Sequence, residues 1–77
     1  QYFRKRHGLW TKYYPSMDDG YVMVKGYYIK GKMEGFWSRF DENGTLRETE
    51  NYLSGNKNGI FKYYDRDGCL IKERLFR

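Results

Sequence analysis

The stretch that decides the fold is Gly35–Gly59, which reads GFWSRFDENGTLRETENYLSGNKNG. Its glycines are spaced by 9, 11 and 4 residues, and the same spacing continues in both directions along the chain. Only Gly26 lies off this frame, and one step is lengthened by residues within positions 15–18. A frame that recurs about every 24 residues predicts tandem copies of one supersecondary unit. The frame consists of Gly8, Gly20, Gly31, Gly35, Gly44, Gly55, Gly59 and Gly68.

Apolar residues recur at fixed places between these glycines. Pairs of them follow each opening glycine, and single ones follow at three further offsets. Four apolar columns aligned with a glycine frame do not arise by chance, and they indicate a repeated unit. The columns are Leu9-Trp10, Phe36-Trp37 and Ile60-Phe61; Tyr13, Phe40 and Tyr64; Val22, Leu46 and Leu70; and Tyr28, Tyr52 and Phe76.

The segments between glycines are rich in aromatic and β-branched residues, which favour strands. No segment has the apolar spacing of a helix. We expect strands near 8–14, 21–30, 35–40, 45–53, 59–64 and 69–76, with a short leading strand around Tyr2–Lys5. The fold class predicted is all-β, a single-domain antiparallel meander of about three tandem β-hairpin repeats. The domain is residues 1–77, with units of about 8–34, 35–58 and 59–77.

Two kinds of turn are expected to join these strands. Asx-Gly pairs are the strongest signal for two-residue hairpin turns, in which both turn residues have positive φ. The segments Gly31–Gly35 and Gly55–Gly59 are expected to form slightly longer turns at the opposite end of the sheet. The Asx-Gly pairs are Asp19-Gly20, Asn43-Gly44 and Asp67-Gly68.

Composition limits the classes of function. The chain has one cysteine, which excludes an internal disulfide and a cysteine-based zinc site. No apolar run approaches the roughly 18 residues of a membrane-spanning helix, and a cytoplasmic location is expected. The net charge of +5 is concentrated near the start, where residues 1–14 contain no acid. This basic N-terminal edge consists of Arg4, Lys5, Arg6 and Lys12.

Rings on both faces of the first strand of each unit imply that one face of the sheet cannot simply be wet, so the sheet must coil on itself or cover an apolar strip with another molecule. We expect the aromatic columns to form a ladder that joins hairpin to hairpin, at roughly 0.2–1 kcal/mol for each cross-strand pair. The exposed part of the ladder would then contact a partner, since Tyr and Trp are enriched at binding hot spots. Tyr14, Tyr27 and Tyr63 are the rings expected to be exposed. The ladder is assigned to Trp10, Trp37, Phe61, Tyr13, Phe40 and Tyr64.

The basic N-terminal edge has two interpretations. A charged edge strand blocks association between sheets, whereas the same charges also suit an anionic partner, either nucleic acid, an acidic lipid surface or an acidic protein. Aromatic residues next to Lys and Arg would stack on single-stranded nucleic acid. Acidic residues throughout the rest of the sheet argue against a nucleic-acid groove.

Catalytic residues are not expected. His7 is the single histidine and lies near the start, and no serine has a histidine at a matching repeat position. Glu48 and Glu50 lie two residues apart on one strand face, a spacing compatible with paired-carboxylate chemistry. Lys72 and Arg74 occupy the same columns one unit later, so cross-strand charge pairing is the preferred explanation. No cofactor or metal is predicted.

The pattern G-x-W/F-x-x-Y/F, then a turn ending in Gly, then x-L and Y-x-x-G-x-x-x-G resembles the MORN (membrane occupation and recognition nexus) repeat. It is most similar to the MORN-variant type of bacterial antitoxin-like repeat proteins. The resemblance covers residues 8–77, and the first unit departs from it by the insertion within positions 15–18. It implies a β-hairpin array without enzymatic activity that binds other proteins, and lipid binding has been proposed for such arrays.

We therefore predict a non-catalytic protein-binding module, in concrete form a small neutraliser such as an antitoxin, immunity protein or inhibitor. The alternatives are a single-stranded nucleic-acid-binding domain of OB-like type and an anionic-lipid-binding scaffold, and self-association is also open. Because the chain begins and ends within a repeat, it is expected to be a segment of a longer array. The predicted partner-binding residues are Arg4, Lys5, Arg6, Lys12, Tyr14, Tyr27, Trp37, Arg39 and Tyr63.

Overall fold

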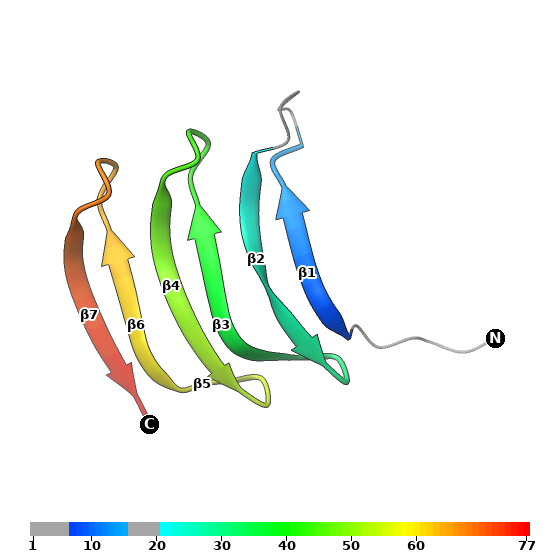
Figure 1. Ribbon diagram of the computed structural model, residues 1–77. Coiled ribbons are helices and arrows are strands. Elements are labelled where there is room, and N and C mark those ends of the chain that lie inside the picture. Colours follow the sequence, from blue (N-terminus) through cyan, green and yellow to red (C-terminus); the bar gives the residue numbers. More distant parts are fainter. Residues whose placement is uncertain (1–6, 16–20) are drawn as a thin grey trace.

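The chain folds as one antiparallel sheet. The computed structural model describes residues 7–15 and 21–77, and every regular element in those ranges is a strand. Six strands lie side by side in the order β1-β2-β3-β4-β6-β7, and the two-residue β5 pairs with β4 (Figure 1). This arrangement confirms the predicted all-β meander. The strands are β1 (Gly8–Tyr13), β2 (Val22–Ile29), β3 (Lys32–Phe40), β4 (Leu46–Leu53), β5 (Asn56–Lys57), β6 (Gly59–Tyr64) and β7 (Leu70–Phe76).

The sheet is a single layer. The Cα atoms span only 12 Å along the thinnest axis, and Figure 1 shows curved strands on which no other element of the described residues is stacked. Most domains bury the apolar face of a sheet against a second layer. Any core of this chain must therefore be made by side chains that cover one another on one face. The predicted leading strand at Tyr2–Lys5 lies outside the described residues.

The turns differ from the prediction, because the two kinds are exchanged. Two turns consist of two residues that both have positive φ. In Lys30-Gly31 the φ values are 53° and 84°, and in Ser54-Gly55 they are 51° and 87°. They join Ile29 to Lys32 and Leu53 to Asn56, and for this reason β3 begins at Lys32, before the predicted position 35. These are the tight hairpin turns expected at the Asx-Gly pairs.

The Asx-Gly pairs lie instead in longer turns. In Asn43-Gly44 only the glycine has positive φ, and the turn is closed by the Gly44 N–H, which donates to the Asp41 carbonyl at 3.0 Å. The Asp41 carboxylate also accepts hydrogen bonds from the backbone N–H groups of Asn43 and Thr45, at 2.9 and 3.0 Å. Asp65 makes the same bonds one unit later, to Asp67 and Cys69. Each turn is thus organised by an aspartate two residues before the Asx-Gly pair. The Asp19-Gly20 pair lies outside the described residues.

The core is a continuous ladder of rings on one face, which we call the ladder face. Each of the six long strands supplies one ring, and neighbouring ring centroids lie 4.7–6.4 Å apart. Trp37 and Phe61, in equivalent positions of successive units, are each only 1% exposed. Their equivalent surroundings confirm the repeat. The ladder runs Trp10, Tyr28, Trp37, Tyr52, Phe61 and Phe76.

Half of the predicted ladder is wrong. Trp10, Trp37 and Phe61 belong to it, but Tyr13, Phe40 and Tyr64 do not. The missing rings come from the column Tyr28, Tyr52 and Phe76 on the second strand of each hairpin. The reason is register, since the residues of this column lie two positions beyond the cross-strand partners of Trp10, Trp37 and Phe61 and share their face.

Candidate binding surfaces

The ladder face is closed by its own side chains. The Lys57 ammonium lies over two rings, at 5.5 Å from the Phe61 centroid and 5.0 Å from that of Phe76. The Lys72 ammonium lies 5.3 Å from the Tyr63 ring on the same face. Such cation–ring contacts stabilise by about 0.5–1 kcal/mol at exposed sites. The charged ends of these lysines thus cover rings that would otherwise be open to a partner.

A charged cluster occupies the middle of the ladder face. The Glu50 carboxylate is buried, with a relative exposure of 3%, and forms an ion pair with the Arg39 guanidinium. Its second oxygen accepts a hydrogen bond from the Tyr52 hydroxyl at 2.9 Å. Burial, followed by the bond to the Glu50 carboxylate, raises the pKa of Tyr52 to about 12. Burial opposes the charge of Arg39, yet the bond to Glu50 leaves the pKa of its guanidinium above the usual value.

Glu48 lies beside this cluster without sharing its ion pair. Burial, and then the neighbouring Glu50 carboxylate, raise the pKa of Glu48 to about 7. The predicted pairing of both glutamates with Lys72 and Arg74 is wrong, because the sheet register places Glu48 opposite Arg39 and Tyr63. The cluster therefore links β3 to β4, and the carboxylate pair is held by structural contacts.

The predicted partner-binding residues divide into several groups. Arg4, Lys5 and Arg6 lie outside the described residues, whereas Lys12 is exposed on β1. Trp37 is buried in the ladder, so a partner cannot reach it without opening the sheet. The Arg39 side chain is 45% exposed although it is paired with Glu50.

The three tyrosines expected to be exposed differ from one another. Tyr27 is 40% exposed. Tyr14 is half-buried and donates its hydroxyl hydrogen to the Phe40 carbonyl at 2.7 Å, so that prediction of exposure is wrong. Tyr63 is half-buried beneath Lys72. The sheet thus leaves one of the three rings openly accessible, and it lies on the face opposite the ladder.

That opposite face, which we call the open face, carries a row of uncovered apolar side chains. Successive residues of a strand point to opposite faces, so Leu9, Phe36 and Ile60 point away from the ladder residues that follow them. Leu9 pairs with Tyr27, and Ile60 pairs with Leu75. Glu34 opposite Tyr27 and Asn51 opposite Phe36 interrupt the row between these pairs. We call this row the apolar strip, and its exposed fractions are Leu9 87%, Tyr27 40%, Phe36 66%, Ile60 47% and Leu75 54%.

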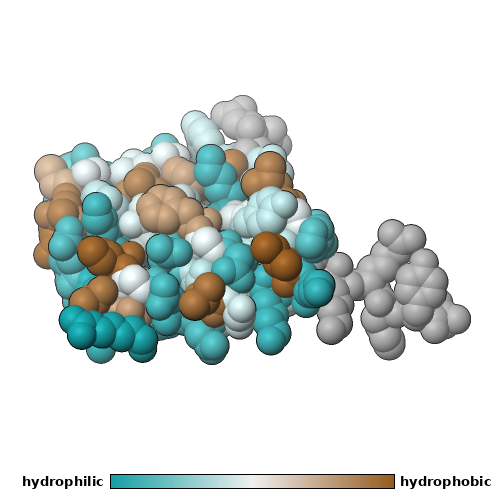
Figure 2. All heavy atoms as spheres, turned by 60° about the horizontal axis from the view of Figure 1, so that its bottom comes forward, coloured by the Kyte–Doolittle hydropathy of each residue, from teal (hydrophilic) through white to brown (hydrophobic). Residues whose placement is uncertain are grey.

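Figure 2 shows how apolar side chains are distributed at the end of the sheet that carries the two-residue turns. Brown side chains stand out singly between teal ones and recur across the width of the sheet. They do not merge into one continuous patch. The surface at this end therefore alternates apolar and polar side chains.

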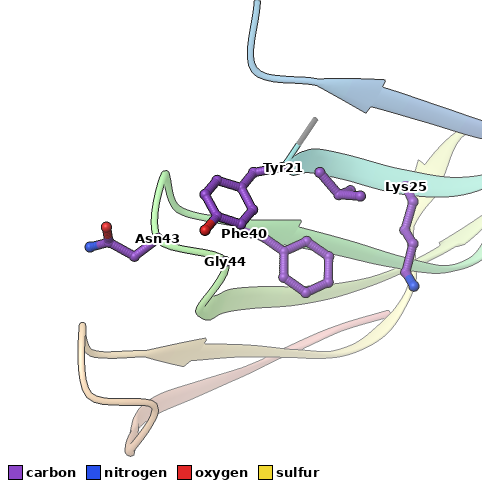
Figure 3. Close-up of a pocket in the computed structure, with 6 residues that line it drawn as sticks. Tyr21, Lys25, Phe40, Asn43 and Gly44 are labelled. Atoms are coloured by element: carbon purple, nitrogen blue, oxygen red, sulfur yellow. The ribbon is translucent and has the colours of Figure 1, made fainter. Parts of the chain in front are cut away.

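A shallow hollow of about 490 Å³ lies at the other end of the sheet. In Figure 3 the rings of Tyr21 and Phe40 lie close together, and the Lys25 side chain extends beside them. The Lys25 ammonium is 5.7 Å from the Phe40 centroid. Asn43 points away from these rings toward the turn. The hollow continues the open face, because Lys25 pairs with Ser38, a neighbour of Trp37 that points away from the ladder.

The described residues offer no other kind of site. In residues 7–15 and 21–77, no three His, Cys, Asp or Glu side chains gather as metal ligands. The same ranges contain no helix long and apolar enough to span a bilayer. The two faces of the sheet are thus the surfaces from which a function must be argued.

Comparison with known proteins identifies the repeat. Residues 33–54, which span most of β3, the Asp41 turn and β4, match the family model described as MORN repeat variant. The chain thus contains a MORN repeat. The hairpins on either side of the matched residues continue the same ladder. No curated protein and no solved structure matches the chain. The match suggests a repeat module that binds proteins or lipids.

Proposed function

We propose that this chain is a non-catalytic protein-binding module whose contact surface is the open face. The observation that carries the proposal is the apolar strip, in which five large apolar side chains stand in one row at 40–87% exposure. A partner that covers these side chains would bury apolar surface that the sheet alone leaves in water. The ladder face is less suited to the task, because its most buried rings are 1% exposed and Phe76 and Tyr63 lie beneath lysines.

A small neutraliser of another protein remains the concrete form that we propose, and its site of action would be the cytoplasm. The resemblance to antitoxin-like MORN-variant proteins supports this form. In it, the basic residues Arg4, Lys5 and Arg6 would steer an acidic partner toward the sheet. Binding should then slow as salt is raised from low to moderate concentration, and stopped-flow association rates measure this change.

The test of the open face is capture of partners from the native host with matched variants. We expect the captured protein to be lost with a Leu9→Ser/Phe36→Ser variant and retained with Lys72→Ser, which removes an exposed cation from the ladder face. Circular dichroism should show that both variants keep the strand content of the parent chain. Equal capture by all three chains would overturn the assignment of the open face.

Binding to nucleic acid is the competing proposal, supported by the lysines and Arg74 that lie over rings on the ladder face. The buried Glu50 carboxylate and the adjacent Glu48 count against it, because a nucleic-acid surface is normally free of acids. Fluorescence anisotropy with a labelled single-stranded oligonucleotide decides between the two proposals. We expect no retention at low salt, whereas tight binding that falls steeply as salt rises would favour phosphate contacts.

A further inference from the structure

We infer that the hollow at the end of the open face receives an aromatic side chain from an acidic segment of the partner protein. The inference rests on the proposed function, since it names the chemistry of the partner at the same surface. The hollow has a volume of about 490 Å³, within the range of roughly 300–1,000 Å³ that is usual for ligand pockets. Its lining contains two rings and one cation, and consists of Tyr21, Val22, Lys25, Phe40, Asn43 and Gly44 (Figure 3).

The two rings of the hollow stand on a backbone that is held in place. The Tyr14 N–H donates to the Tyr21 carbonyl at 3.0 Å, and the Tyr14 hydroxyl donates to the Phe40 carbonyl at 2.7 Å. The Tyr21 ring also lies against the neighbouring turn, since a β-carbon at Gly44 would be in van der Waals contact with it at 3.9 Å. These contacts exist before a partner binds, which lowers the entropic cost of association. A third ring would pack against the first two edge to face or offset, arrangements that aromatic side chains prefer.

The ring and the cation of the hollow belong to the first unit and not to the repeat itself. One unit later the positions of Tyr21 and Lys25 are taken by Thr45 and Thr49, and β4 still occupies its place in the sheet. The fold therefore does not require a ring or a cation at these two positions. Tyr21 is nonetheless 40% exposed, and a partner that covers it would bury apolar surface.

The charge beside the rings suits a carboxylate. The Lys25 ammonium lies 5.7 Å from the Phe40 centroid, and the cross-strand neighbours of Lys25 are the uncharged Thr11 and Ser38. Within residues 7–15 and 21–77, no carboxylate forms an ion pair with Lys25. An ammonium has three hydrogen-bond donors and no acceptor. A carboxylate of the partner that is close in sequence to the inserted ring would therefore find its counter-charge at the rim of the hollow.

The lysines around the hollow favour an acidic segment over a basic one. The sheet register places Lys32 and Lys62 on the open face together with Lys25. Two glutamates of the described strands share this face: Glu34 accepts a hydrogen bond at 2.9 Å from a backbone N–H of the turn between β4 and β5, and Glu73 is the cross-strand partner of Lys62. The three lysines thus outnumber the glutamates, and a surface with excess positive charge attracts an acidic partner.

Selection from a library of short random peptides tests this chemistry without knowledge of the partner. We expect the immobilised 77-residue chain to retain peptides that combine an aromatic residue with neighbouring Asp or Glu residues. Retained peptides that lack this combination, or a library from which no peptide is retained, would overturn the inference.

Matched variants show whether the retained peptides occupy the hollow. Tyr21→Thr and Lys25→Thr introduce the residues that the next unit has at these positions, so both should keep the strand content of the parent chain in circular dichroism. In fluorescence anisotropy with a retained peptide, Tyr21→Thr should weaken binding roughly tenfold, and Lys25→Thr about two- to fivefold, as expected for an exposed ion pair. The control Lys62→Thr removes the same charge from the same face outside the hollow and should weaken binding less than Lys25→Thr does. Equal losses for the two lysine variants would mean that the peptide recognises only the overall charge of the face, and the inference would fail.

Capture from the native host separates this inference from the proposed function. We expect the partner to be lost with the Leu9→Ser/Phe36→Ser variant and also with a Tyr21→Thr/Lys25→Thr variant. Loss with the first variant and retention with the second would reject the hollow as the anchor site while leaving the open face as the contact surface.

Discussion

At position 26, the Trp37 ring occupies the space that a side chain would need. Gly26 is the one glycine outside the repeat frame, and the equivalent positions in the next two units are Glu50 and Arg74. A β-carbon at Gly26 would lie 2.0 Å from Cδ2 of Trp37, far inside van der Waals contact. A side chain in this place would therefore prevent Trp37 from lying between the ladder rings of β1 and β4.

We expect Gly26→Ala to lower the free energy of unfolding by about 1–3 kcal/mol, because an overpacked core must move to accommodate the methyl group. Urea denaturation followed by tryptophan fluorescence measures the loss. The same substitution in a Trp37→Leu background is the control and should cost clearly less, since the clashing ring is then absent. Equal costs in the two backgrounds would show that contact with Trp37 is not the cause.

The indole nitrogen of Trp37 is a polar atom that makes no hydrogen bond within the described residues. Its Nε1 atom is buried and has no hydrogen-bond acceptor among the described residues. Trp37→Phe should therefore cost less than about 1.5 kcal/mol, as a near-conservative core exchange does, and Phe61 already fills the equivalent place. Trp37→Ala should cost about 3–5 kcal/mol, because it leaves a cavity in the ladder. Chemical denaturation measures the free energy of unfolding that each variant loses. Similar losses for Trp37→Phe and Trp37→Ala would mean that the indole nitrogen makes a hydrogen bond that a phenyl ring cannot replace.

At the scale of the turn, one aspartate carboxylate organises each Asx-Gly hairpin. Hydrogen bonds from backbone N–H groups hold the pKa of Asp65 below its usual value, and they do the same for Asp41 against an opposing effect of burial. A lowered pKa contributes stability that is present above pH 3.8 and is lost as the pH falls through the lower folded value. We expect Asp41→Ala and Asp65→Ala to lower the melting temperature at pH 7, and Asp→Asn to lower it less because the amide oxygen still accepts. The differences should shrink as the pH falls below 3.8, and melting curves recorded across this fall test the sign.

Glu48 makes a contribution of opposite sign in a different pH range. Its pKa is raised to about 7 by burial and then by the Glu50 carboxylate, from an ordinary value of 4.5. The associated stability is fully present below pH 4.5 and is lost as the pH rises through about 7. A Glu48→Gln variant should therefore unfold at higher urea concentration than the parent chain at pH 8, with little difference at pH 4.5. Urea midpoints measured from pH 4.5 to 8 test this, and parallel curves for the two chains would contradict it.

Strand positions could be predicted from the glycine frame, but the contacts between strands could not. A frame of this kind shows where the chain reverses, and the central hairpin of β3 and β4 is close to its predicted ranges. An Asx-Gly pair fits both a two-residue turn and a longer one closed by the glycine alone, and only the position of the preceding Asp41 distinguishes the two here. Faces are decided by register, and a shift of one residue exchanges them. Sequence reasoning consequently assigned Phe40 to the ladder and paired Glu50 with the wrong cation.

The candidate site was anticipated only in part for the same reason. Rings on both faces of the first strands predicted an apolar face that the chain does not cover, and Leu9 and Phe36 are exposed on the open face. Trp37 was nevertheless selected as a contact residue because its size suits a hot spot, whereas the sheet uses that size to fill the ladder. Its neighbour Phe36 faces the other way and is 66% exposed. Alternation along β3 would have identified Phe36 once Trp37 was placed in the core.

For the whole molecule, the ladder makes stability a property shared between neighbouring hairpins. Trp37 contacts Trp10 and Tyr28 in the hairpin before it and Tyr52 in its own, and Tyr52 in turn contacts Phe61 in the hairpin after it. In a linear array the total stability is the sum of unit terms and of terms for the interfaces between units. The ring contacts of Trp37 are the main apolar interface between the first two hairpins, so its removal should uncouple them.

We therefore expect the parent chain to unfold in one calorimetric transition, and Trp37→Ala to unfold in two. The β1–β2 hairpin should melt first, because among the described strands it pairs with the rest of the sheet through β3 alone, and the substitution weakens that contact. Native-state hydrogen exchange gives the same information by residue: amides of β3 and β4 should exchange most slowly in the parent chain, and protection in β2 should fall most in the variant. The matched control is Phe36→Ala on the open face of the same strand, which removes a ring of similar size without touching the ladder. It should lower stability little and leave a single transition in a monomeric sample. Two transitions in this control as well would mean that coupling between hairpins depends on the backbone ladder of hydrogen bonds more than on the rings.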